Sequence, residues 1–282
     1  MRILDSIDRV ADRYDALFCD IWGVVHNGRR AYPGACAALQ RMRAAGKRVI
    51  LISNVPRPRS VIPDQLAKVG APGDAWDAIV TSGDATRAAL SARAPGPVFR
   101  IGIEDYDAPL YEGLPLEAAP LESARFISIT GLFRWEDTPA DYAGILRAAL
   151  ARDLEMVCAN PDIIVQAGER MLWCAGAVAR DYEKMGGRVV MAGKPFAPIY
   201  ELAYRELDAL GGAPDRARIL CIGDGVGTDV AGANGQGLDS VFIASGMHGE
   251  ALWTNGAADA AKIEAALAQE NARATYAMAA LA

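Results

Sequence analysis

Short apolar runs recur along the chain, and each ends where small polar or acidic residues begin. The runs that are typical of buried parallel strands cover residues 16–19, 48–54, 77–83, 188–191, 217–222 and 240–244. Stretches with helical spacing lie between several of them, at residues 35–45, 60–70 and 197–209. Because strands and helices alternate with short connections, the pattern predicts an α/β fold on a right-handed parallel sheet. At the two ends of the chain, residues 2–14 and 258–280 indicate helices.

The middle of the chain has an alternation of its own. Strands are predicted at residues 98–103, 125–130 and 154–159, and helices at residues 84–93, 139–151 and 174–185. We therefore predict a core domain made of residues 1–83 and 187–282, interrupted by an inserted α/β domain of residues 84–186. In this division the strand at residues 188–191 returns to the core sheet.

Composition and charge narrow the classes of partner. The 282 residues are 52% hydrophobic and carry a formal net charge of -6, which argues against nucleic acid as the main partner. No apolar run approaches the roughly 20 residues that cross a bilayer, so no membrane association is expected. The five cysteines are dispersed and mostly in apolar runs, which is typical of reduced thiols in a cytoplasmic protein. With two histidines a multi-histidine metal site is not expected, whereas oxygen-ligated Mg²⁺ stays open.

Four of the predicted strands end in residues that can carry chemistry. They offer a carboxylate, a hydroxyl, an ammonium and further carboxylates: Asp20, Ser53 with Asn54, Lys194, and Asp224 with Asp229. Each of these alone is usual in a turn or a helix cap. Parallel strands place their carboxyl ends at one edge of a sheet, so the side chains can converge there. As a set they suit a phosphoryl group with Mg²⁺, because phosphoryl transfer needs a nucleophile, cations on the phosphoryl oxygens and fixed donors.

The order of these motifs resembles the haloacid dehalogenase-like (HAD) hydrolase superfamily. The motifs are Asp20 with Gly23-Val24, Ser53-Asn54, Gly193-Lys194-Pro195, and the run from Gly223 to Asp229. With Asn160-Pro161-Asp162, and with the insertion between the Ser and Lys motifs, they are similar to class IIA, the NagD-type sugar- and nucleotide-phosphate phosphatases. The resemblance implies a Rossmann-like parallel-sheet core, an inserted class II cap domain, and a Mg²⁺-dependent phosphatase acting on a small phosphorylated metabolite. Proteins of this class often pair through their caps, so a homodimer is an expectation by analogy.

The resemblance also implies catalytic and substrate-binding roles for matching residues. Asp20 would be the nucleophile that forms an aspartyl-phosphate, and Lys194 would orient it and stabilise the phosphoryl group. In the cap, the loop of residues 163–173 would face the active site together with the Asn-Pro-Asp motif. The implied substrate-binding residues are Ser53, Asn54, Lys194, Asn160 and Asp162.

The resemblance implies a magnesium site beside the nucleophile. Its protein ligands would be Asp20, Asp224 and the backbone carbonyl of Trp22, with Asp229 as a further ligand or a nearby support. The carbonyl needs no particular side chain, so this site survives the unusual residue at position 22.

The chain departs from the family pattern at that position. Related phosphatases carry a second Asp two residues after the nucleophile, which protonates the leaving alkoxide and then activates water, and this chain has Trp22 there. General acid–base help of this kind is worth about 10²–10⁴-fold, and the indole N–H is a donor that does not titrate in the working range. His26, in the loop that follows, is the candidate replacement.

Three interpretations therefore stay open. The protein is a phosphatase whose proton transfer uses another group or whose substrate has a good leaving group, such as an acyl phosphate. Alternatively it is a HAD enzyme of different chemistry, such as a dehalogenase, or a catalytically weak protein that binds a phosphorylated ligand. Lys194 with Asp224 and Asp229 favours Mg²⁺ and phosphate over dehalogenation.

Overall fold

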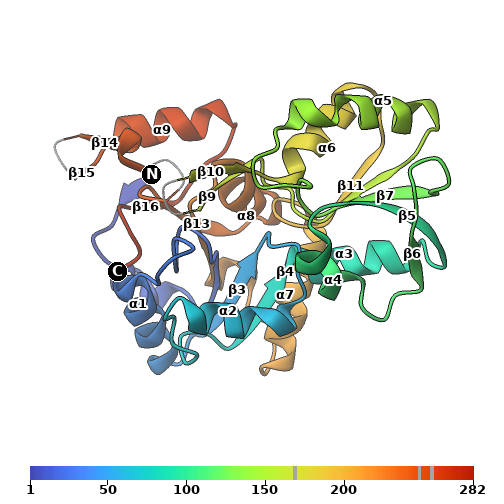
Figure 1. Ribbon diagram of the computed structural model, residues 1–282. Coiled ribbons are helices and arrows are strands. Elements are labelled where there is room, and N and C mark those ends of the chain that lie inside the picture. Colours follow the sequence, from blue (N-terminus) through green and yellow to red (C-terminus); the bar gives the residue numbers. More distant parts are fainter. Residues whose placement is uncertain (168–169, 247–248, 255–256) are drawn as a thin grey trace.

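The computed structural model describes residues 1–167, 170–246, 249–254 and 257–282. Two parallel sheets, each covered by helices, organise the chain into two lobes (Figure 1). In the larger sheet all neighbouring strands run parallel. Its strands lie in the order β1 (Arg2–Ile3), β16 (Tyr276–Met278), β13 (Asp239–Ile243), β12 (Ile219–Gly223), β2 (Ala16–Cys19), β3 (Arg48–Ser53) and β4 (Ala78–Thr81).

Helices cover both faces of the larger sheet. On one face Leu39 and Leu66, from two helices, pack in the same apolar cluster as Leu51 of β3. On the other face Tyr200 packs with Ile50, the preceding residue of the same strand. Successive strand residues point to opposite faces, so a strand that is apolar throughout is buried on both. The helices of this lobe are α1 (Pro33–Ala44), α2 (Ile62–Lys68), α7 (Ala197–Ala209), α8 (Ala231–Gln236) and α9 (Ala260–Gln269). Helix α3 (Ser82–Ser91) follows β4 and leads from this lobe into the second one.

The second sheet is also parallel and has its own core. Leu146 and Val178, from two covering helices, pack with Ile127 and Met156 of its central strands. This arrangement confirms the α/β fold predicted from the sequence, with a Rossmann-like parallel core and a second, inserted α/β unit. The strands lie in the order β11 (Val189–Met191), β8 (Met156–Cys158), β7 (Phe126–Ile129), β5 (Gly96–Ile101) and β6 (Leu116–Ala118), and the helices are α4 (Glu104–Tyr111), α5 (Ala143–Ala151) and α6 (Ala175–Lys184).

The sequence predicted that the strand at residues 188–191 returns to the core sheet, and the structure shows that it does not. As β11 it pairs in parallel with β8, with Val190 opposite Val157, in the second sheet. Both sheets are parallel and buried, so an apolar run does not reveal which of them it joins. We therefore move the proposed boundary and take residues 84–191, called the insertion below, as the inserted domain.

The two chain ends also differ from the predicted helices. Residues 2–14 form β1 and two short 3₁₀ turns, η1 (Ile7–Arg9) and η2 (Ala11–Arg13). Near the other end, helix α9 is followed by strand β16, which fits between β1 and β13. The alanine-rich sequence favours a helix by propensity, but a buried position between two strands overrides it here.

The segment after Asp162, predicted as a loop, contains an antiparallel pair of strands. β9 (Ile164–Ala167) pairs with β10 (Arg170–Trp173), and we call this pair the hairpin. Its residues line the cavities described below. The remaining short elements are η3 (Arg59–Val61), η4 (Pro139–Tyr142), η5 (Arg216–Arg218), the π-helical η6 (Val226–Val230), η7 (Gly249–Leu252), β14 (Trp253–Thr254) and β15 (Ala257–Ala258).

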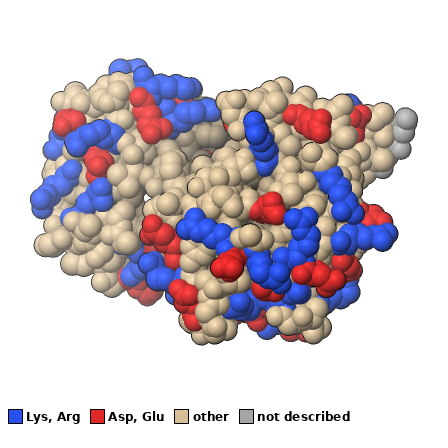
Figure 2. All heavy atoms as spheres, turned by 180° about the vertical axis from the view of Figure 1, so that it is seen from behind, with Lys and Arg blue, Asp and Glu red and all other residues tan. Residues whose placement is uncertain are grey.

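The distribution of charge on the surface and the lengths of the helices concern two kinds of partner, charged molecules and membranes. Seen from behind, acidic and basic side chains are interspersed over the described part of that face (Figure 2). Among the residues that the structure describes, none of the helices has the length and apolar character needed to cross a bilayer.

Candidate active site

The carboxyl ends of the core strands meet at a cavity of about 190 Å³. Asp20 follows β2, Ser53 ends β3, and Asp224 follows β12, so three neighbouring strands deliver three of the predicted residues. Parallel strands make this convergence possible. The predicted site residues that line the cavity are Asp20, Trp22, Ser53, Asn54, Asp162, Lys194, Asp224 and Asp229.

Lys194 connects two of the carboxylates. Its Nζ lies 2.5 Å from Asp20 Oδ1 and 2.7 Å from Asp229 Oδ1, and all three side chains are buried. Burial alone would lower the pKa of Lys194, but the surrounding carboxylates, Asp20 foremost, outweigh it and raise the pKa above its ordinary value. Lys194 is therefore a fixed cation that orients the Asp20 carboxylate.

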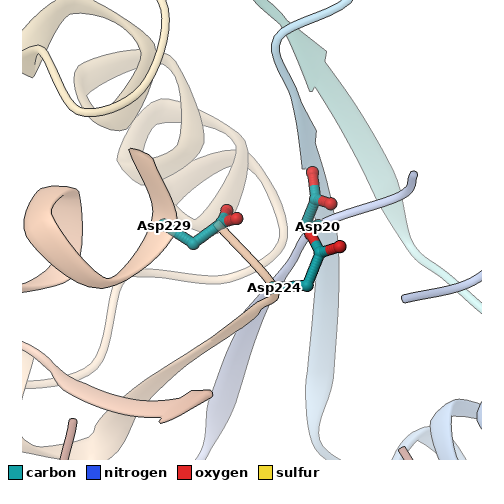
Figure 3. A group of neighbouring side chains, drawn as sticks. All are labelled: Asp20, Asp224 and Asp229. Carbon is teal, nitrogen blue, oxygen red and sulfur yellow. The ribbon is translucent and has the colours of Figure 1, made fainter. Parts of the chain in front are cut away.

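Three carboxylates gather around this one ammonium. The ligand atoms of Asp20, Asp224 and Asp229 lie within 4.8 Å of one another, and the carboxylates of Asp20 and Asp224 lie close together (Figure 3). Burial raises the pKa of Asp20 well above its ordinary value, and the charges of Asp229 and Asp224 act in the same direction, against Lys194. Within this group negative charges exceed the positive one by two, so a divalent cation would balance it.

The Asp229 carboxylate is occupied by hydrogen bonds to Lys194 and to the backbone. One of its oxygens accepts from Lys194 Nζ, and the other accepts from the backbone N–H of Gly225 at 3.0 Å. Both oxygens are therefore in use, and Asp229 fits the role of a support better than that of a primary metal ligand.

Two glycines make room for the Asp224 carboxylate. A Cβ on Gly23 would lie 2.1 Å from Asp224 Oδ2, and one on Gly246 would lie 2.0 Å from the same atom. Gly23 also has φ +84°, which other residues adopt only with strain. Gly246, after β13, was missed in the sequence, although the rule that singled out the other strand ends would have included it.

Asn54 reaches the site, but its side chain is already engaged. Oδ1 accepts from the Lys194 backbone N–H at 2.7 Å, and Nδ2 donates to the Lys194 carbonyl at 3.1 Å and to Asp162 Oδ1 at 2.8 Å. Both amide hydrogens are used, so this side chain positions Lys194 and Asp162. The neighbouring Ser53 hydroxyl accepts from the Val55 N–H at 3.2 Å and keeps its own hydrogen for donation.

His26 lies outside the cavity lining, behind Trp22. Its ring meets the indole edge-on, with centroids 4.9 Å apart. Its Nδ1 accepts from the backbone N–H of Gly28 at 2.8 Å, so the proton of the neutral ring is on Nε2. Burial lowers the pKa of His26 to about 4. A neutral ring placed there supports Trp22, and its position argues against the proton-transfer role expected from the sequence.

Trp22 itself is held against the backbone. A Cβ on Gly28 would lie 2.7–2.8 Å from the indole ring, so the ring packs on a residue without a side chain. Trp22 lines the active-site cavity and also a second cavity beside it. Trp22 is therefore a fixed wall between the two.

The insertion contributes to the site through the segment that follows β8. Asp162 lines the cavity, and so does Val165 of the hairpin. Asn160 does not line this cavity but lines the second one, and its Oδ1 accepts from the Asp162 N–H at 3.1 Å. This bond makes the Asn-Pro-Asp motif a turn, which aims Asp162 at Asn54. The contribution of Val165 had no polar signal in the sequence.

Two family models match the chain. One, described as haloacid dehalogenase-like hydrolase, matches residues 17–112, and a second, described as HAD-hydrolase-like, matches residues 191–270. The matches include Asp20, Ser53, Lys194 and Asp224 and leave out most of the insertion.

Similar proteins have been solved or characterised. A crystal structure of a hydrolase of the haloacid dehalogenase-like family from Brucella suis is 44% identical, covers 99% of this chain and 100% of its own, and has a TM-score of 0.89. Chronophin from Rattus norvegicus is 28% identical over 81% of this chain and 75% of its own length. A D-glycerol 3-phosphate phosphatase from Mycobacterium tuberculosis is 26% identical over 85% of this chain and 65% of its own. A glycerol phosphate phosphatase structure from that organism, with magnesium, has a TM-score of 0.63 at 22% identity, covering 88% of this chain and 73% of that one.

Proposed function

Because the chain belongs to the haloacid dehalogenase-like hydrolase family, we propose that it is a phosphatase acting on a small phosphorylated compound. The observation that carries this proposal is the buried contact of 2.5 Å between Lys194 Nζ and Asp20 Oδ1 beside two further carboxylates. A carboxylate oriented by a fixed ammonium is a nucleophile ready for in-line attack on phosphorus. The relative named D-glycerol 3-phosphate phosphatase supports a phosphate monoester as the substrate class.

Each of the chain's own groups has a step in this reaction. Asp20 attacks the phosphorus and forms an aspartyl-phosphate, which water then hydrolyses. Lys194 holds Asp20 in place and offers positive charge to the phosphoryl oxygens, and the Ser53 hydroxyl donates a hydrogen bond to them. Asn54 positions Lys194 through its hydrogen bonds to the Lys194 backbone.

The residues present fit a Mg²⁺ ion. Carboxylate oxygens of Asp20 and Asp224 and the Trp22 carbonyl are hard donors, and Asp229 supports them through Lys194. When bound, Mg²⁺ neutralises charge on the phosphoryl oxygens. The same carboxylates without a cation repel one another, so metal binding also stabilises the site.

Proton transfer sets the limits of this activity. Trp22 supplies no proton, and neutral His26 lies behind the indole with its Nδ1 occupied. Substrates whose leaving group departs without a proton, such as acyl phosphates, are therefore favoured over simple alkyl phosphates.

Hydrolysis of acetyl phosphate with and without Mg²⁺ tests the proposal. We expect Mg²⁺-dependent phosphate release and a phosphorylated protein that can be trapped with labelled substrate. Both are lost in Asp20→Asn and kept in Asp15→Asn, because Asp15 precedes the opposite end of β2 and pairs with Arg218 at the surface. Release that persists in Asp20→Asn would contradict the proposed nucleophile.

The second candidate is a catalytically weak protein that binds a phosphorylated ligand. It is favoured by Trp22, because the indole cannot act as a general acid. Mg²⁺-dependent binding of phosphate compounds without turnover would support that candidate. A dehalogenase is less compatible, because Lys194 lies among three carboxylates suited to a cation; release of halide from 2-haloacids would test it.

A further inference from the structure

A second cavity, of about 430 Å³, adjoins the active site. Trp22, Ser53, Asp162 and Val165 line both cavities, so the two spaces meet at these four residues. A phosphoryl group beside Asp20 and Ser53 would therefore have room on this side for whatever it is attached to. The volume lies within the range of about 300–1,000 Å³ that small-molecule pockets occupy.

Aromatic side chains from separate parts of the fold surround this second cavity. Trp22 comes from the core, Tyr106 from α4, Trp135 from the segment after β7, and Trp173 from β10 of the hairpin. The last three stay 36%, 52% and 41% exposed, respectively, although aromatic rings are usually buried. Exposed rings that converge on one cavity are typical of a ligand site.

The rings are arranged in fixed contacts. Tyr106 and Trp135 meet edge-on with centroids 6.0 Å apart, and the Arg57 guanidinium lies 4.4 Å from the Tyr106 ring centroid on the core side. Trp22 is fixed in turn by Gly28 and His26. A flat ring entering the cavity would find faces and edges already placed for stacked or edge-on contact.

We propose that this cavity binds the ring of an aryl phosphate, the phosphate monoester of a phenol; this rests on the phosphatase function proposed above. The cavity offers flat apolar walls directly beside the phosphoryl site. The leaving group matches the missing proton donor at Trp22, since a phenol has a pKa of about 10 and water about 16, so phenolate leaves unprotonated far more readily than hydroxide or an alkoxide.

The reaction balances without a proton from the protein in its first step. Asp20 forms the new oxygen–phosphorus bond, and the phosphorus–oxygen bond to the ring breaks, with its electron pair leaving on the phenolate. Water then attacks the phosphorus of the aspartyl-phosphate, Asp20 leaves as the carboxylate, and both water hydrogens go to the released phosphate.

Kinetics with two substrates separate the ring cavity from the phosphoryl site. Acetyl phosphate has no ring, whereas phenyl phosphate does. We expect Trp173→Ala and Trp135→Ala to lower kcat/KM for phenyl phosphate by about tenfold each and to leave acetyl phosphate within about twofold. Met171→Ala is the matched control, because Met171 is 50% exposed on the same strand as Trp173 but does not line the cavity. The parent should also hydrolyse phenyl phosphate at least about tenfold faster than benzyl phosphate, whose leaving group is an alkoxide.

The outcomes distinguish this inference from the proposed function. Unchanged phenyl phosphate hydrolysis in both Trp variants, with Asp20-dependent acetyl phosphate hydrolysis intact, would overturn the ring cavity alone. Equal rates on phenyl and benzyl phosphate would overturn the assignment of the leaving group. If neither acetyl phosphate nor phenyl phosphate is hydrolysed, the phosphatase proposal fails, and calorimetric titration with phenylphosphonate still tests the cavity. Binding weakened about tenfold in Trp173→Ala supports the ring cavity, and binding equal to the parent overturns it.

Discussion

Replacing Trp22 by Asp tests the reasoning about proton transfer most directly. The variant places a carboxyl group two residues after Asp20, where the family pattern has its acid and base. We expect kcat/KM for an alkyl phosphate such as benzyl phosphate to rise by about 10²–10⁴-fold, the usual value of general acid–base help. That gain corresponds to about 2.7–5.4 kcal/mol of transition-state stabilisation.

The same change has costs that the structure allows us to weigh. The edge-on contact with His26, at 4.9 Å between centroids, is lost, and such a pair contributes about 0.5–1.5 kcal/mol beyond its buried area. A fourth carboxyl group also joins the three whose ligand atoms lie within 4.8 Å of one another. Both effects lower the stability of the metal-free variant, and Mg²⁺ should therefore raise its Tm more than that of the parent.

The assay compares benzyl and phenyl phosphate at saturating Mg²⁺. Trp22→Asn is the control, since it removes the indole equally and supplies no proton. We expect Trp22→Asp to gain far more on benzyl than on phenyl phosphate, and Trp22→Asn to gain on neither. If Trp22→Asp is folded and binds Mg²⁺ but turns over benzyl phosphate no faster than Trp22→Asn, the missing acid is not what limits this enzyme.

Three further predictions concern charge. Lys194→Met leaves two buried carboxylates without their ammonium, so urea unfolding in EDTA should show a loss of about 3–5 kcal/mol, recovered in part by Mg²⁺; a loss under about 1 kcal/mol would contradict the pairing. Folding lowers the pKa of His26 from 6.5 to about 4, so its contribution to stability is full above pH 6.5 and is lost as the pH falls through 4. Over that pH range the free energy of unfolding of the parent should fall by about 3 kcal/mol more than that of His26→Gln. Parallel curves of unfolding free energy against pH for the two proteins would refute this. Arg134 lines the ring cavity without an ion-pair partner among the described residues, so the parent should prefer 4-carboxyphenyl over phenyl phosphate by about fivefold in kcat/KM, a preference that Arg134→Gln should abolish and Met171→Ala should keep.

Much of the fold follows from the sequence because the core strands are apolar on both faces. Residues 16–19 and 197–209 have in the structure the bounds predicted for them, as β2 and α7. The strands β11 and β16 were assigned wrongly for a different reason. Each is a three-residue strand whose partner is distant in the chain, and neither hydrophobic period nor propensity identifies a distant partner.

The site was predictable where one rule applied and not elsewhere. Strand ends of a parallel sheet meet, so Asp20, Ser53 and Asp224 could be brought together in advance. Lys194 also lines the cavity, but it follows β11 of the second sheet, so this rule does not explain its place. The work of Asn54 depends on hydrogen bonds to residues 108 and 140 positions away, which no local pattern contains. The position of His26 behind the indole depends on where the indole lies, and the indole packs on Gly28, which has no side chain to block it.

Trp22 affects the shape of the site as well as its proton transfer, because it lies between the two cavities. The residue lines both of them, so one substitution changes the chemistry on one side and the shape on the other. Without a carboxyl group the site discriminates against alkoxide leaving groups, and with an indole it offers a wall for a flat one. Both effects favour the same kind of ester.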